Sequence, residues 1–162
     1  MVVLFITHPD VIVDPAIPVP TWSLSSSGRA KMEAFSASNV FATLEAIWSS
    51  NETKAKEATD ILGARLDLPV RIEADLREND RSATGYLPPM EFERVADAFF
   101  RVPDASTRGW ERARTTNPPR ATIGALTRER ARCFILGGRW CQYDWAARGR
   151  LRLLAIVTLS GI

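Results

Sequence analysis

His8 is the single histidine of this 162-residue chain, and it directly follows the apolar, β-branched run VVLFIT (2–7). An imidazole at the end of such a run can act as a nucleophile, as an acid or base, or as a ligand. A structural histidine with a satisfied hydrogen bond is the alternative that the position leaves open. A single histidine excludes His-pair metal sites, HExxH peptidases and two-histidine mechanisms, unless another residue substitutes.

A second group of candidate residues follows the apolar segment 45–50. Ser49 and Ser50 end this segment, and Lys54 lies one turn into the helix predicted next. Hydroxyls and a cation at a helix N-terminus suit a phosphate group. The alternative is a serine that caps the helix, with Lys54 on a solvated face.

A third group follows the segment 70–76 and consists of Glu78, Asn79, Asp80 and Arg81. Glu78 could donate a proton, and Arg81 could hold an anion with its planar guanidinium. The alternative is an ordinary polar surface loop. Reactive groups at three successive strand ends are nevertheless typical of one shared site, because the carboxyl ends of parallel strands lie at one edge of a sheet.

The segments that must position these groups alternate between strand and helix patterns. Strands are predicted at 2–7, 45–50 and 70–76, the last one half-exposed because its apolar residues alternate. Helices are predicted after Ser25 or Ser26 as N-cap, over 52–67 with Ser50 or Asn51 as cap, and over 91–100 after two prolines. Residues 11–21 contain three prolines and predict an extended loop. This order indicates an α/β fold with a mostly parallel sheet in one domain, residues 1–162.

The composition is that of an ordinary globular protein, with 46% hydrophobic and 25% charged residues. Two cysteines are too few for a disulfide scaffold and lack the spacing of a zinc site. No apolar run reaches the ~18–20 residues of a membrane span, and the apolar start is too short for a signal peptide. We therefore expect a cytoplasmic protein.

Charge divides the chain into two parts. Residues 114–162 hold nine arginines, no lysine and two acidic residues, whereas acidic residues exceed basic ones over 1–113. Such asymmetry can indicate a tail that binds nucleic acid or a membrane. The arginines are interspersed with tryptophan, cysteine and leucine, and no nucleic-acid-binding signature is present, so we expect neither partner. The Arg-rich segment 114–152 has no strand or helix period, and only 153–160 predicts a further core strand.

Taken together, these segments resemble the histidine phosphatase superfamily, also called phosphoglycerate mutase-like. The resemblance rests on four segments in order: VLFITHPDV (3–11), WSLSSSGRA (22–30), IWSSNETKAKEAT (47–59) and DLREND (75–80). It covers about residues 2–113. The Thr-His-Pro start, ENDRSATGYLPP (78–89) and RGWERA (108–113) resemble a bacterial branch of the family more closely than the mutases.

The resemblance implies a three-layer α/β/α sandwich that hydrolyses phosphomonoesters through a phosphohistidine on His8. Glu78 matches the general acid that protonates the leaving oxygen, and Lys54 falls on the family's phosphate-clamping arginine. The expected phosphate contacts are Thr7, Ser50, Lys54 and Arg81. The partner would be a small phosphorylated substrate or phosphate, and neither a metal nor an organic cofactor is expected.

The chain also departs from the family pattern. Thr7 and Pro9 replace the family's Arg and Gly, and Lys54 is a point charge rather than a bidentate fork, for which Arg81 could compensate. The family's second histidine, late in the chain, is absent. An inactive, truncated or frameshifted member that at most binds a phosphate-like anion is therefore the alternative.

The frameshift hypothesis rests on the Arg-rich segment 114–152, whose composition is that of GC-rich DNA read out of frame. With permissive codon choices, TRERARCFIL (127–136) can be back-translated and shifted to resemble the missing histidine motif. A frameshifted chain is expected to lose a central strand and a helix, which would leave the fold incomplete at the C-terminus.

Overall fold

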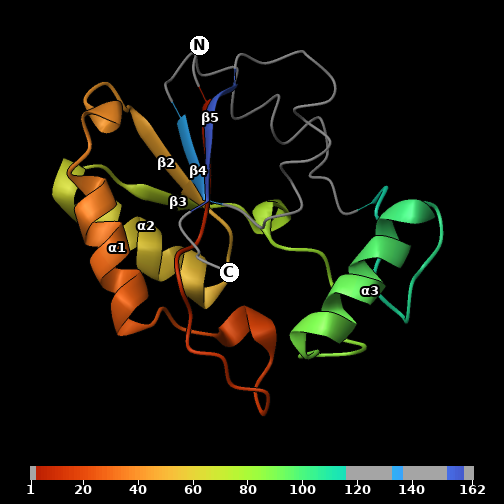
Figure 1. Ribbon diagram of the computed structural model, residues 1–162. Helices are drawn as coiled ribbons and strands as arrows, with labels where there is room; N and C mark the ends of the chain where they lie inside the picture. The colour runs from red at the N-terminus through yellow and green to blue at the C-terminus, as the bar shows by residue number, and fades with distance from the viewer. Residues whose placement is uncertain (1–2, 116–132, 137–152, 159–162) are drawn as a thin grey trace.

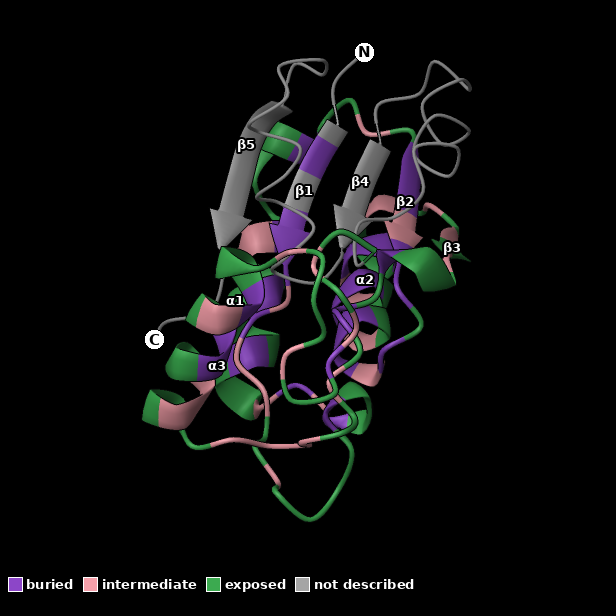
Figure 2. Cartoon of the chain, turned by 90° about the vertical axis from the view of Figure 1, so that its right-hand side faces the viewer, coloured by how far each residue is buried: buried purple, intermediate pink, exposed green. Residues whose placement is uncertain are grey.

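A computed structural model describes residues 3–115, 133–136 and 153–158. Its centre is a five-stranded parallel sheet with the order β3-β2-β4-β1-β5. The strands are β1 (Val3–Thr7), β2 (Ala46–Ser49), β3 (Val70–Ile72), β4 (Cys133–Leu136) and β5 (Leu153–Thr158). All the described pairings between neighbouring strands are parallel, and the arrowheads of β1 and β2 point the same way in Figure 2. The loops that follow β1, β2 and β3 therefore leave the sheet at one edge.

In the described part of the chain, three α-helices flank the sheet. Helices α1 (Ser26–Ser36) and α2 (Thr53–Leu66) cover one face, and α3 (Pro89–Arg101) lies on the other side (Figure 1). This arrangement confirms the three-layer α/β/α fold with a parallel sheet. The main core lies between the sheet and the first two helices, and its most buried members include Ile6, Met32, Ile47, Ala58 and Leu62. None of the described helices is long and apolar enough to cross a membrane.

Strand β4 occupies the middle of the sheet. Its last residue, Leu136, pairs with Ile6 of β1 and with Ser49 of β2. The frameshift hypothesis predicts the loss of a central strand, whereas residues 133–136 form one. Most of the Arg-rich segment 114–152 lies outside the described residues, so its predicted lack of regular structure stays a prediction.

The segment after His8 is held against the start of α1. Ser25 caps this helix as predicted, since its hydroxyl accepts a hydrogen bond from the Gly28 amide at 3.0 Å. The Ser25 amide in turn donates to the Asp10 carbonyl at 3.0 Å. A Cβ at Gly28 would stand 2.0 Å from that carbonyl oxygen, so only glycine allows this approach. The contact fixes the chain two residues after His8.

Two predicted boundaries are wrong. The N-cap of α2 is Glu52, not Ser50 or Asn51, and its side chain makes no capping hydrogen bond. The third strand ends at Ile72 and not at residue 76, because Ala74–Leu76 form a 3-10 turn. The Glu73 carboxylate accepts a hydrogen bond from the Asp75 amide and closes this turn, a local bond that competes with the sheet ladder.

Helix α3 builds a second, smaller apolar cluster. Its buried Val95 and Phe99 pack with Trp110, and Phe92 joins them at the edge. The Trp110 indole nitrogen donates to the Thr84 hydroxyl at 2.8 Å. The helix and the chain that follows it are thereby attached to the polar loop that begins at Glu78.

Candidate active site

His8 follows the last residue of β1 and is half-buried. Its Nδ1 lies 2.7 Å from the Pro9 carbonyl oxygen. A carbonyl can only accept, so Nδ1 carries the hydrogen of this bond. The other ring nitrogen, Nε2, lies 3.4 Å from Oε1 of Glu78. The imidazole is therefore oriented by the backbone carbonyl of the next residue, Pro9, and presents Nε2 to the Glu78 carboxylate.

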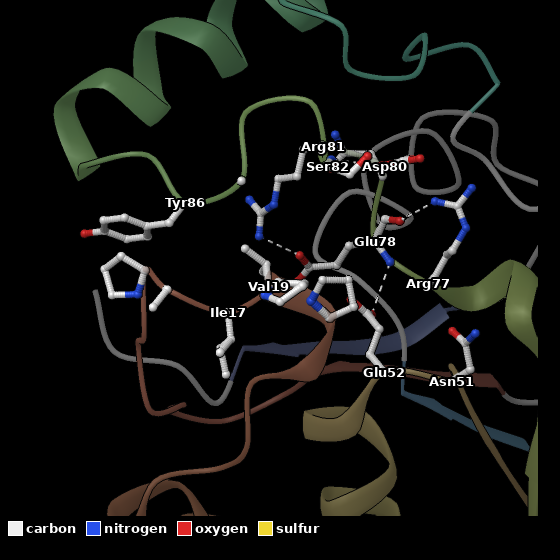
Figure 3. Close-up of a pocket in the computed structure, with 16 residues that line it drawn as sticks. Ile17, Val19, Asn51, Glu52, Arg77, Glu78, Asp80, Arg81, Ser82 and Tyr86 are labelled. Carbon is white, nitrogen blue, oxygen red and sulfur yellow. Dashed lines mark hydrogen bonds and ion pairs between the residues drawn. The ribbon is translucent and has the colours of Figure 1, made fainter.

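Glu78 is the centre of the cluster. Besides His8, its Oε1 faces Lys54 Nζ at 3.5 Å. Its Oε2 accepts from the Arg81 guanidinium at 2.9 Å, a contact that Figure 3 shows. Burial by itself would raise the pKa of Glu78. The charges of Lys54 and Arg81 outweigh burial and hold this pKa well below its usual range. Glu78 is thus ionised in the free protein.

Lys54 lies in the first turn of α2, and its side chain is only 2% exposed. Its Nζ stands 3.4 Å from Oε1 of Glu52 as well as 3.5 Å from Glu78. The alternative of a lysine on a solvated helix face is therefore wrong. Lys54 is thus a buried cation held between two carboxylates of the cluster.

Glu52 is a member of the cluster that the sequence did not single out. Its Oε2 accepts hydrogen bonds from the Ser50 hydroxyl at 3.1 Å and from the Glu78 amide at 3.2 Å. Through these bonds the turn between β2 and α2 is joined to the loop that carries Glu78. A glutamate before a helix is usually interpreted as a surface charge near the helix N-terminus, so sequence gave no signal of this role.

Arg81 is positioned by α3. Its guanidinium lies over the ring of Phe92, 5.0 Å from the ring centroid, and its side chain is 16% exposed. Stacking on an aromatic face and pairing with Glu78 fix the plane of the guanidinium. The alternative of an ordinary surface loop does not apply to Glu78 or Arg81, because both side chains are largely covered.

Two further polar side chains are buried nearby without partners in the described part of the chain. The Thr7 hydroxyl, at the end of β1, makes no hydrogen bond with a described residue, and neither does the side-chain amide of Asn79. Ser50 is joined to the cluster by its hydrogen bond to Glu52. The structure therefore brings His8, Lys54, Glu78 and Arg81 together, while the phosphate contacts predicted for Thr7 and Ser50 stay predictions.

The cluster borders a cavity of about 630 Å³ that is lined in part by Glu78 and Arg81. Two cations, Lys54 and Arg81, face two carboxylates, Glu52 and Glu78, so these four groups balance. Among the described residues, no group of three or more His, Cys, Asp or Glu side chains could hold a metal ion. An anion could be held here once Glu78 takes up a proton and releases its cations.

Comparison with known families decides the affiliation. The sequence profile of the histidine phosphatase superfamily (branch 1) matches residues 19–136. The chain belongs to this superfamily. The match confirms the resemblance found in the sequence; it begins after His8 and includes the first part of the Arg-rich segment 114–152. No curated protein sequence matches this histidine phosphatase superfamily member significantly.

Solved structures share the fold at low sequence identity. Mycobacterial glucosyl-3-phosphoglycerate phosphatase is 16% identical, with a TM-score of 0.73 over 88% of this chain and 76% of that one. YhfR from Bacillus stearothermophilus is 18% identical, with a TM-score of 0.73 over 93% and 81% of the two chains. The protein histidine phosphatase SixA, solved with tungstate, is 16% identical, with a TM-score of 0.54 over 96% and 82%. At such identities the likeness shows the fold alone.

Proposed function

We propose that this protein hydrolyses phosphomonoesters through a phosphohistidine formed on Nε2 of His8. One observation carries the proposal: Nε2 lies 3.4 Å from the Glu78 carboxylate, which two cations also contact. A nucleophile, a proton donor and anion-binding groups are thus gathered at the carboxyl edge of the sheet. Support also comes from the mycobacterial phosphatase of the same fold, which has been solved with inorganic phosphate and with VO3.

The first step transfers the phosphoryl group to the enzyme. When a phosphate ester binds, Lys54 and Arg81 turn to its oxygens, and Glu78 then loses the charges that keep it ionised and takes up a proton. The Nε2 lone pair attacks phosphorus, the N–P bond forms and the P–O ester bond breaks. Glu78 gives its proton to the leaving oxygen, so the alcohol departs uncharged.

The second step regenerates the enzyme. Water attacks phosphorus, the N–P bond breaks and Glu78 accepts the proton that the water loses. His8 is released with its Nε2 lone pair, still held at Nδ1 by the Pro9 carbonyl. Inorganic phosphate leaves, and the two steps together consume one water. Splitting the hydrolysis in this way replaces one difficult step with two easier ones.

The assay that tests this proposal uses para-nitrophenyl phosphate with three variants. We expect His8→Ala to abolish turnover and the acid-labile phosphoenzyme, which can be trapped by rapid quenching. Glu78→Gln should lower kcat by about 10²–10⁴-fold, the range of general acid catalysis. Glu33→Gln changes an exposed acid on α1 and should leave kcat unchanged. Hydrolysis that persists in His8→Ala would rule out the phosphohistidine.

A second candidate function is anion binding without turnover. It is favoured by the single histidine of the chain, because the family's second histidine is absent. This candidate predicts that phosphate raises the melting temperature of the wild type while no ester is hydrolysed. Lys54→Met should remove the phosphate effect, because it deletes one of the two cations.

A further inference from the structure

The cavity beside Glu78 has one strongly apolar wall. This wall consists of six consecutive residues, PAIPVP (15–20), together with Tyr86. Figure 3 shows Ile17, Val19 and Tyr86 on one side of the cavity and Asn51 and Arg77 on the other. A volume of about 630 Å³ falls within the range that small organic ligands occupy. Ile17 is 41% exposed, so a ligand in the cavity could remove apolar surface from water.

The apolar wall is built before any ligand arrives. Three prolines within 15–20 restrict the backbone. The Trp22 indole nitrogen donates to the Asp14 carbonyl at 2.9 Å, just before this segment. The Trp22 ring also packs against Tyr86 with 6.0 Å between ring centroids. Because both parts of the wall are tied to Trp22, a ligand pays little for ordering them.

The opposite wall offers little to a second anionic group. Of the two described cations that line the cavity, Arg81 is assigned to the phosphoryl group in the proposed mechanism, and Arg77 is paired with the Glu111 carboxylate at 2.8 Å. Arg77 also donates to the Glu78 carbonyl at 3.0 Å. Glu52 and Asp80 line the same cavity and add negative charge. A carboxylate on the substrate would have to compete with these partners.

We propose that this cavity binds the leaving group of the substrate, and that the leaving group is an uncharged alcohol with an aryl or branched alkyl body. Alcohols that carry a carboxylate or a second phosphate would be disfavoured. The assignment of the bound group as a leaving group rests on the proposed phosphatase function, which places Glu78 at the ester oxygen. The apolar preference itself can be measured without any turnover.

Phosphonates that cannot be hydrolysed provide the test. Dissociation constants of phenylphosphonate, methylphosphonate and 3-phosphonopropionate are measured by calorimetry on the full chain. We expect phenylphosphonate to bind at least about tenfold more tightly than methylphosphonate, since a buried ring gains apolar contact. The carboxylated ligand should bind no more tightly than methylphosphonate. The hydrolysis rates of the phenyl and methyl phosphate esters should follow the same order.

Two variants and one matched control locate the effect. Ile17→Asn should reduce the phenyl-to-methyl affinity ratio to about one. The control is Ile12→Asn, because Ile12 belongs to the same loop and is 57% exposed but does not line the cavity. This variant should have the affinity ratio of the wild type. Tyr86→Ala should lower the ratio as well and replaces the first variant if that one does not fold. The ratio cancels any change in phosphate affinity that a variant causes.

The outcomes separate this inference from the proposed function. Four outcomes overturn the inference. The protein does not bind phenylphosphonate, it binds the phenyl and methyl ligands equally well, it binds the carboxylated ligand more tightly than methylphosphonate, or Ile12→Asn lowers the affinity ratio as much as Ile17→Asn does. A phenyl preference that Ile17→Asn removes supports it even if no ester is hydrolysed, in which case the phosphatase proposal alone fails. Hydrolysis without any phenyl preference supports the phosphatase and overturns the apolar pocket.

Discussion

Glu78 must be ionised in the free protein and protonated when the ester bond breaks. Lys54 and Arg81 keep its pKa low, despite burial. An anion that draws Lys54 and Arg81 away removes this stabilisation, so the pKa of Glu78 should rise on binding. Substrate binding and proton uptake are then one event, which supplies the acid only when a substrate is present.

Proton uptake on anion binding is directly measurable. Calorimetry of phosphate binding in two buffers with different ionisation enthalpies should show net uptake of protons by the wild type at about pH 6, beyond the change in phosphate's own ionisation. Glu78→Gln should lack this extra uptake, because its amide does not titrate. Equal uptake by the two proteins would show that Glu78 keeps its charge when the anion binds.

The same carboxylate makes the free energy of unfolding depend on pH. The folded-state pKa of Glu78 lies below its unfolded value of about 4.3, so its stabilisation is complete above that value and is lost as the pH falls towards the folded pKa. Denaturant unfolding should therefore show a wild-type stability that declines from about pH 5 downwards more steeply than that of Glu78→Gln. Parallel pH profiles would mean that the ion pairs of Glu78 contribute no net stability.

At the scale of elements, the contact between the chain after His8 and the start of α1 carries a prediction. Gly28→Ala would place a Cβ 2.0 Å from the Asp10 carbonyl oxygen, so the backbone after His8 must move. We expect a lower melting temperature and a larger loss of kcat than of phosphate affinity, because a shift of His8 misaligns the attack. Ser26→Ala, at an exposed position of the same helix turn, is the control. If Gly28→Ala leaves kcat unchanged, the contact between Gly28 and Asp10 does not position His8.

The elements also show what the sequence could and could not predict. Apolar periodicity and capping residues predicted the order of strands and helices and the Ser25 cap, because both depend on residues close together in the sequence. The meeting of three strand ends followed from that order, because parallel strands end at the same edge of a sheet. Two features of the site were not predicted: Glu52 links two loops, and Phe92 lies beneath Arg81. Both depend on contacts between segments that are distant in the sequence. No local pattern encodes such contacts. The shortened third strand was missed because Glu73 closes a turn that alternation alone does not reveal.

At the scale of the whole molecule, the chain combines a family core with an Arg-rich segment that lacks the family's second histidine. Four apolar residues, Cys133–Leu136, fill the central strand position between β1 and β2. A strand buried in a parallel sheet requires mainly apolar residues. Any reading frame that encodes such a run could therefore supply this strand. The central strand is therefore compatible with a change of frame near codon 113.

The frameshift hypothesis makes a prediction about the coding DNA and a prediction about activity. Translation of codons 113–155 in the other two frames should reveal a His-Gly or His-Ala motif after a strand pattern. A chain rebuilt in that frame should hydrolyse para-nitrophenyl phosphate about 10²–10³-fold faster than this one, because a second imidazole adds a donor to the transferring phosphoryl group. His8→Ala in the rebuilt chain should abolish the gain. If neither frame holds such a motif, the single-histidine site is what the gene encodes, and anion binding without turnover becomes the favoured function.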